Sequence, residues 1–251
     1  WRLYDRDAYD ESRAGGSITL EKFFDADHRW SAAFSYVGDL VDIRDVERDA
    51  PDDAVEVEGD AFVGFPRLEL RCDLRELNYY SGAKGFMATS RLDVAHAALG
   101  SDVEFVRASA SARYDLHLFD DRPDYRHVLR TGIEVLWENG IGGSEVPLFE
   151  RFYLGGPSTF RGFGYRGMGP SQNNVPVGGE GGIHGTVEYA FPLVLREFRG
   201  VAIFEWGDLE PRFSDVAWDR FRLAAGGGLE QRLRLLGQPV PDQPEVVEYE
   251  R

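Results

Sequence analysis

The chain has 251 residues, 43% of them hydrophobic and 13% aromatic, with 29 glycines and a formal net charge of −16. This length allows one large or two small domains, and the glycine and aromatic content favours β-structure. The acidic balance argues against nucleic acid as a partner, because there is no basic stripe for phosphates, and no apolar run reaches the roughly 18 residues of a transmembrane helix.

Alternating hydrophobicity begins with residues 16–21. There, Ile18 and Leu20 fall on one parity and polar residues on the other, as a half-buried strand requires. Residues 30–40 repeat this pattern after a short polar turn. The acidic stretch that follows, Asp45–Asp60, predicts an exposed loop.

The next segments have one apolar face and one ionic face. In residues 62–75, Leu68 and Leu70 share one parity, while the other carries mostly charges. Residues 86–94 and 106–118 alternate in the same way, and the second run is longer than a usual strand of about five or six residues. Such runs suit a tilted membrane strand of about 9–11 residues with a polar lumen behind it. A soluble β-sandwich is the alternative, because alternation alone does not separate a sandwich from a membrane barrel.

Further alternating segments lie at residues 129–137, 183–193, 202–206 and 221–235. Together the segments predict roughly ten strands, joined as an antiparallel meander by short turns and longer loops. No helical periodicity interrupts them, and no shift in composition marks a second domain. One all-β domain is therefore expected across residues 1–251.

The longest loop, Leu148–Pro170, has the sequence LFERFYLGGPSTFRGFGYRGMGP and combines glycine and proline with arginines and aromatic residues. A flexible linker would lack bulky apolar side chains, whereas these aromatic residues need something to pack against. A long loop of this composition is usually ordered and functional.

Signals for a cofactor or a metal are weak. Gly162–Gly167 match GxGxxG literally, but a dinucleotide site needs a parallel strand before the match and a helix after it, and prolines bracket this one. The five histidines have no metal-ligand spacing. We therefore expect no cofactor and no metal site.

The loop sequence closely resembles the signature of the outer-membrane assembly barrel superfamily. This family comprises BamA- and TamA-type insertases and two-partner-secretion transporters, and is also called the bacterial surface antigen family. The motif residues are Phe160, Arg161, Gly162 and Phe163, and the residues that support the loop are Gly155, Gly156, Pro157, Gly164 and Gly167. Downstream, VEYAFPL, FEWGDLE and RLAAGGGLEQRL are similar to the three strands that follow the loop in the family.

The resemblance implies a transmembrane β-barrel of about sixteen antiparallel strands, of which about ten or eleven are present here. In the family the barrel follows periplasmic POTRA modules, which this chain lacks. We therefore expect residues 1–251 to be a single barrel domain, incomplete at both ends and part of a longer protein. That protein is expected in the outer membrane of a Gram-negative type bacterium, reached through a signal peptide not present in this chain.

The resemblance also assigns a role to the loop, which is expected to fold into the lumen as a brace. The Arg161 guanidinium then needs carboxylate partners, because an unpaired buried cation is costly. Glu205 matches a family acidic position, and Glu188 matches another and points to the lumen by its parity. We expect Arg161 to pair with Glu205, Glu188 or both, with Gly162 close to the wall and the flanking phenylalanines wedged against it.

Other charged side chains share the inward parity of the strands. They are Arg107, Arg113, Asp115, Arg130 and Glu134. Such residues could line a conduit or neutralise one another, and we favour mutual pairing.

The function implied by the resemblance is the assembly and insertion of outer-membrane proteins, or protein translocation, rather than an enzymatic reaction. Expected partners are outer-membrane lipid, unfolded or nascent β-barrel or secreted protein substrates, and accessory assembly lipoproteins or periplasmic modules. Two alternatives are kept. The barrel could anchor a patatin-like lipase or another hydrolase, or it could be a passive outer-membrane pore.

Overall fold

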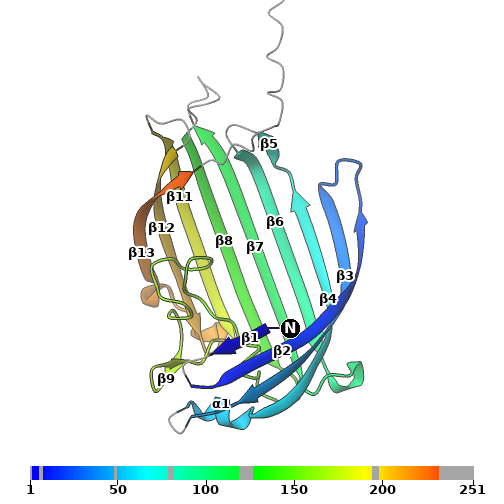
Figure 1. Ribbon diagram of the computed structural model, residues 1–251. Helices are drawn as coiled ribbons and strands as arrows, with labels where there is room; N and C mark the ends of the chain where they lie inside the picture. The colour runs from blue at the N-terminus through cyan, green and yellow to red at the C-terminus, as the bar shows by residue number, and fades with distance from the viewer. Residues whose placement is uncertain are drawn as a thin grey trace, which may run out of the picture.

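A single antiparallel sheet dominates the computed structural model, which describes residues 2–5, 8–47, 50–78, 82–118, 127–193 and 198–231. The nine long strands are β2 (Asp10–Phe23), β3 (Trp30–Arg44), β4 (Gly59–Asp73), β6 (Gly82–Ala95), β7 (Phe105–Leu118), β8 (His127–Gly140), β11 (Gly181–Pro192), β12 (Phe198–Glu210) and β13 (Arg222–Gln231). Each long strand pairs with its neighbour in sequence, so the sheet is a meander (Figure 1). The predicted all-β antiparallel meander is confirmed, and the last four residues of the segment at 221–235 lie outside the described part.

The remaining elements are short. They are β1 (Arg2–Asp5), which pairs with β2, β5 (Glu76–Asn78), which pairs with β6, the hairpin of β9 (Ser171–Gln172) and β10 (Val175–Pro176), helix α1 (Asp52–Glu56), and the 3₁₀ turns η1 (Ala97–Leu99), η3 (Phe213–Asp215) and η4 (Trp218–Arg220). Among the described residues, no helix has the length and apolar character needed to cross a membrane.

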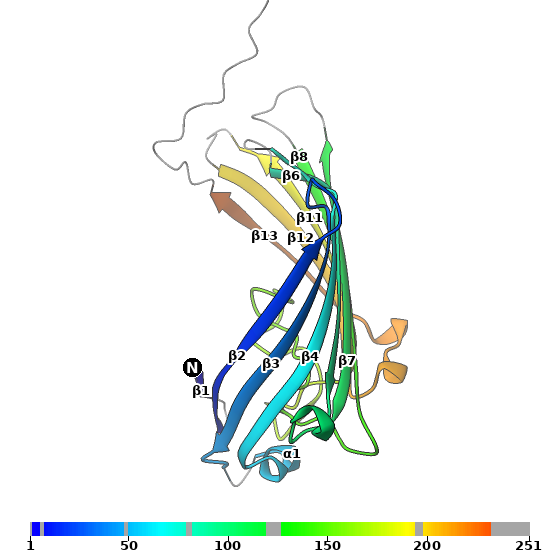
Figure 2. The ribbon, with the colours of Figure 1, turned by 90° about the vertical axis from the view of Figure 1, so that its right-hand side faces the viewer.

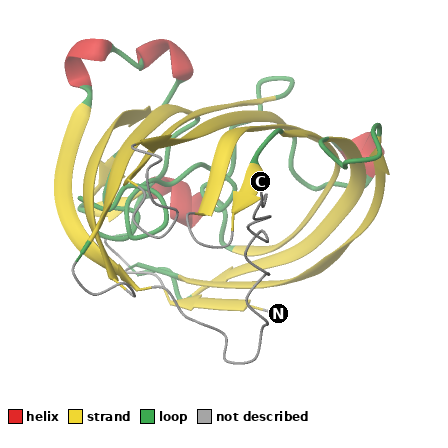
Figure 3. Ribbon diagram, turned by 90° about the horizontal axis from the view of Figure 1, so that it is seen from above, coloured by secondary structure: helices red, strands yellow, loops and turns green. Residues whose placement is uncertain are grey.

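The sheet is strongly curved and has a concave and a convex face (Figures 2 and 3). Its long connections, at residues 45–58, 96–104, 141–180 and 211–221, gather at one end, which we call the loop end. The opposite end, which we call the turn end, includes the short connection at residues 24–29. Long loops at one end and short turns at the other are the usual arrangement of outer-membrane barrels.

The convex face is apolar and exposed. Ile18 and Leu20 of β2 are 79% and 74% exposed, and the same face carries the exposed side chains of Phe34, Leu40, Leu68, Leu70, Leu92, Ile133, Phe204, Leu223 and Leu229. An apolar surface that runs across a whole sheet is unstable in water and marks contact with lipid or protein. The parity predicted for these residues agrees with their exposure.

The buried core lies at the loop end, on the concave side, where loops pack on the inward faces of the strands. Strand residues such as Phe65 and Phe105 contact loop residues such as Leu148 and Phe149 there. The prediction that Asp45–Asp60 is an exposed loop holds only in part, since residues 45–58 do connect β3 to β4 but are not all loop or all exposed. This stretch contains α1, and Ala54 in the helix is fully buried because it packs into the same core.

Candidate functional site in the inward-folded loop

The connection between β8 and β11, residues 141–180, lies on the concave side of the sheet, and we call it the inner loop (Figures 1 and 3). Its tip is closed by backbone hydrogen bonds from the Gly156 N–H to the carbonyls of Phe160 and Phe163. Gly155 has a φ of 114°, which favours glycine, and a Cβ there would lie 2.4 Å from the Gly164 carbonyl oxygen. The tip is thus a compact structure that presents the predicted motif to the strands.

Arg161 lies against both carboxylates that the sequence singled out. Its Nε donates to Glu205 Oε1 at 2.7 Å, and its backbone N–H donates to Glu205 Oε2 at 2.6 Å. Its Nη1 donates to Glu188 Oε2 at 3.0 Å. Burial alone would lower the pKa of Arg161, but the hydrogen bonds and charges of the two glutamates raise it, so the guanidinium stays charged.

Glu188 and Glu205 come from neighbouring strands, β11 and β12. Glu205 is only 2% exposed, and it accepts two hydrogen bonds from a single loop residue. Glu188 also pairs with Arg130 of β8, which in turn lies 3.5 Å from Glu230 of β13. One chain of charges therefore links the loop tip to four strands, because a buried carboxylate is stable only with such partners.

The residues beside Arg161 fix the tip by packing. Phe160 is fully buried in a hydrophobic cluster that also contains Leu136, Leu154, Met168 and Leu209. Phe163 meets the Phe160 ring edge to face at a centroid distance of 5.0 Å. Gly162 lies against Ala224 of β13, so closely that an added Cβ would be 2.2 Å from the Ala224 Cβ.

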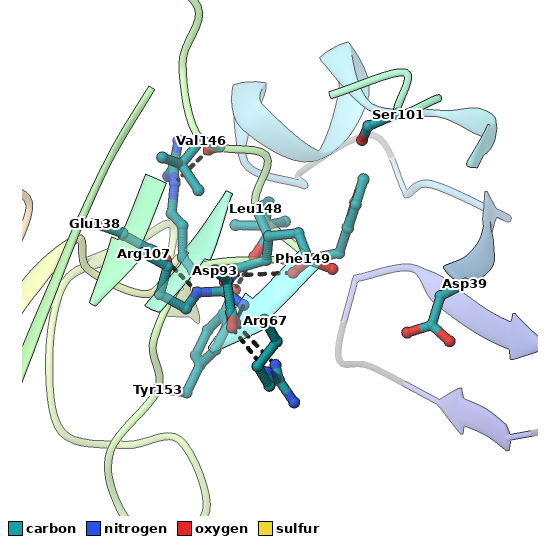
Figure 4. A network of polar contacts seen from close by, with 12 residues as sticks. Asp39, Arg67, Asp93, Ser101, Arg107, Glu138, Val146, Leu148, Phe149 and Tyr153 are labelled. Carbon is teal, nitrogen blue, oxygen red and sulfur yellow. Dashed lines mark hydrogen bonds and ion pairs between the residues drawn. The ribbon is translucent and has the colours of Figure 1, made fainter. Parts of the chain in front are cut away.

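A second charged cluster holds the beginning of the inner loop (Figure 4). Glu150 accepts a hydrogen bond from Arg107 of β7 at 3.0 Å, and its other carboxylate oxygen forms an ion pair with Arg13 of β2 at 2.9 Å. Arg107 also pairs with Glu138 of β8 at 2.8 Å. These side chains are mostly buried, and the cluster ties the loop to β7 and β8 and also to β2, which lies beyond β3, β4 and β6 in the sheet.

The predicted mutual pairing of the inward charges is found in part. Arg113 pairs with Asp115 at 2.9 Å. Arg107 and Arg130 pair instead with glutamates outside the predicted set. The sequence reasoning missed Glu150 as an anchor, although its position within the loop signature and the inward parity of Arg107 were available as signals.

The other supporting residues lie where they shape the tip. Thr159 Oγ1 donates to the Gly155 carbonyl at 3.0 Å, and the Gly155 N–H returns a hydrogen bond to the same hydroxyl at 2.9 Å. Pro157 borders a cavity of about 330 Å³ beside Arg161. Among the described residues, no cluster of three or more histidine, cysteine or acidic side chains is arranged to hold a metal ion.

Residues 2–233 match the Omp85 superfamily domain. The chain is 26% identical over 211 residues to the outer membrane protein assembly factor BamA of Nitratidesulfovibrio vulgaris, which covers 81% of this chain and 25% of that protein. It is 32% identical over 143 residues to the sorting and assembly machinery component 50 homolog of Xenopus tropicalis, which covers 55% of this chain and 28% of that protein. The chain thus spans about a quarter of the length of these curated relatives.

Two solved structures share the fold. BamA from Haemophilus ducreyi lacking POTRA domains 1–3 superposes with a TM-score of 0.74 at 18% identity, over 91% of this chain and 51% of that chain. CdiB from Acinetobacter baumannii superposes with a TM-score of 0.59 at 14% identity, over 90% of this chain and 37% of that chain. At these identities the likeness shows the barrel-type fold alone.

Proposed function

The chain belongs to the Omp85 superfamily, and from this premise we propose that it is part of the barrel of a protein that assembles outer-membrane proteins or translocates secreted ones. Within that barrel, the inner loop is the brace that sets the working shape of the lumen. The observation that carries the proposal is the contact of Arg161 with Glu188 and Glu205.

The brace acts through geometry and charge. Arg161 and Gly162 are adjacent in the chain, yet together they contact β11, β12 and β13. A fixed tip keeps these strands in one relative arrangement. The free energy for inserting a substrate strand then comes from backbone pairing and from the transfer of apolar side chains into lipid.

The proposed partners follow from this role. The exposed convex face suits outer-membrane lipid, and the substrates are unfolded or nascent β-barrel proteins or secreted proteins. Accessory lipoproteins or periplasmic modules would bind outside the part of the barrel seen here. The relatives named as assembly factors support this class of substrate.

The test uses the full-length protein that contains this chain. Arg161→Ala should reduce the insertion of a reporter barrel into liposomes by about tenfold, because a loss of roughly 1–2 kcal/mol at the tip lowers the equilibrium constant for seating the loop by that order. Arg161→Lys should restore little of the insertion activity, since an ammonium group does not reproduce the forked guanidinium that reaches Glu205 and Glu188 together.

The matched control is Arg29→Ala, at the turn end, where Arg29 and Asp27 form an exposed ion pair at 3.0 Å. This variant should insert the reporter at the wild-type rate. Wild-type activity of Arg161→Ala, at equal amounts of folded protein, would contradict the brace.

A further inference from the structure

The connection between β12 and β13, residues 211–221, lies on the face opposite to the inner loop, and we call it the outer loop. Its two 3₁₀ turns, η3 and η4, project from the convex side of the sheet at the loop end (Figures 2 and 3). Two loops from the same end of the sheet thus go in opposite directions. The inner loop enters the polar concave space, and the outer loop reaches the apolar face.

Three aromatic rings fix the outer loop on this face. Trp206 of β12 and Phe221 stack at a centroid distance of 5.6 Å with an interplanar angle of 13°. Trp218 of η4 lies 4.8 Å from Phe221 and 6.3 Å from Trp206. Trp206 itself covers Gly185 so closely that a Cβ at Gly185 would be 2.0 Å from its ring. The cluster is therefore seated firmly on the sheet.

Trp218 is nevertheless 77% exposed, although it is held in place by two rings. Its neighbours on the same face, Leu223 and Phe204, are also exposed, so the apolar convex surface continues up to the outer loop. The loop also carries two arginines and two aspartates, so it brings no net charge. A large exposed aromatic side chain between an apolar surface and a polar, neutral segment fits the boundary between lipid chains and headgroups.

We propose that the outer loop is a membrane-interface anchor. The Trp218 indole lies at the headgroup boundary of the leaflet on the loop-end side, with its ring toward the acyl chains. At the turn end of the same face, Trp30 and Phe24 are exposed as well and mark the opposite boundary. The anchor holds β12 and β13, the strands that carry Glu205 and Ala224, at a fixed depth in the membrane.

The experiment measures the depth of Trp218 in the full-length protein folded into liposomes. Fluorescence is compared between wild type and Trp218→Phe, so that the difference reports Trp218 while Trp206 stays in place. Lipids brominated near the headgroup end of the acyl chain should quench this difference several-fold more than lipids brominated near the chain end. Aqueous iodide should quench it weakly.

The matched control is Tyr165, which is 68% exposed in the inner loop and borders a polar cavity with Arg166. A tryptophan placed there by Tyr165→Trp should be quenched by iodide and not by brominated lipid. A Trp218 signal that follows the Tyr165→Trp pattern would overturn the anchor.

This inference rests on the proposed membrane placement and not on the brace. The difference in fluorescence between wild type and Trp30→Phe reports Trp30, and its quenching separates an error in the membrane placement from an error in the anchor. If both Trp30 and Trp218 respond only to iodide, the membrane placement itself is wrong. If Trp30 is quenched by brominated lipid and Trp218 only by iodide, the anchor alone is wrong.

Discussion

Glu188 is shared by two arginines that come from distant parts of the chain. It accepts from Arg161 of the inner loop and from Arg130 of β8. Glu205, by contrast, serves Arg161 alone among the contacts described, through both the side chain and the backbone. The two carboxylates therefore differ in kind. Glu205 fixes the position of Arg161, whereas Glu188 connects Arg161 of the inner loop to Arg130 of β8.

The close approach of Gly162 to Ala224 leads to a prediction at the same scale. Gly162→Ala should displace the tip, because its methyl group would overlap the Ala224 methyl, and overpacking of this kind costs about 1–3 kcal/mol. The measurement is the rate at which a protease cleaves the inner loop in folded protein. The double variant Gly162→Ala/Ala224→Gly should restore protection, since it moves the methyl group from one side of the contact to the other.

Gly164→Ala is the control for this prediction. A Cβ at Gly164 meets nothing within 4 Å, so this variant should resist the protease like wild type. Equal protease sensitivity of Gly162→Ala and Gly164→Ala would show that loop flexibility, and not the contact with β13, decides the result.

At the scale of elements, the inner loop is held at two separate places. Its beginning is fixed by Glu150 between Arg13 and Arg107, and its tip by Arg161 between β11 and β12. The first attachment lies near the buried loop-end core, while the second faces the middle of the strands. The loop therefore spans the concave space, and the two attachments can be tested independently.

A double-mutant cycle between Glu150 and Arg107 tests the first attachment. Because both side chains are almost buried, we expect a coupling of about 1–3 kcal/mol in the free energy of unfolding, measured by urea titration of Glu150→Gln, Arg107→Gln and the double variant in liposomes. The same cycle on the exposed pair of Arg29 and Asp27 should give no measurable coupling. Similar values for the two pairs would mean that the Glu150 cluster does not hold the loop.

Particular elements show what the sequence could predict. The outward parity of Leu68 and Leu70 followed from alternation, because a sheet with one polar and one apolar face imposes a period of two. Helix α1 was missed because its acidic residues indicate solvent, and Ala54 is its one buried residue. The pairing of Glu150 with Arg13 depends on how the loop enters the sheet, which local patterns do not encode.

The Arg161 site could be predicted from the sequence more fully than the Glu150 attachment of the inner loop. Glu188 and Glu205 could be named from parity and resemblance, and the structure places both within hydrogen-bond distance of Arg161. Their role in function stays a prediction. The outer loop gave no signal in the sequence, because the contacts of Trp218 with Phe221 and Trp206 arise only when β12 and β13 pair.

At the scale of the whole molecule, one continuous curved sheet has a polar concave side filled in part by a loop and an apolar convex side. This arrangement inverts that of a water-soluble protein, in which apolar side chains gather inside. The sheet follows a single path from β1 to β13 within the described residues. Its stability therefore depends on strand pairing along the whole path and on the solvent that meets the convex side.

This architecture predicts heat-modifiable migration of the full-length protein in gel electrophoresis. Unheated samples in dodecyl sulfate should keep the sheet and migrate differently from boiled samples, because all ladder hydrogen bonds must break together. Arg161→Ala should retain this shift, since the strands pair without the loop tip. If Arg161→Ala lost the shift, the loop would be required for folding of the sheet and would be more than a brace.

The contact of two adjacent loop residues with two paired strands has a mechanical consequence. Glu205 and Ala224 face each other across the pairing of β12 and β13, and they are the contacts of Arg161 and Gly162. If these two strands moved apart, the tip could follow only one of them, and either the ion pair or the glycine contact would be lost. The loop tip thus holds β12 and β13 together across their pairing. Loss of either of its two contacts would report that these strands have separated.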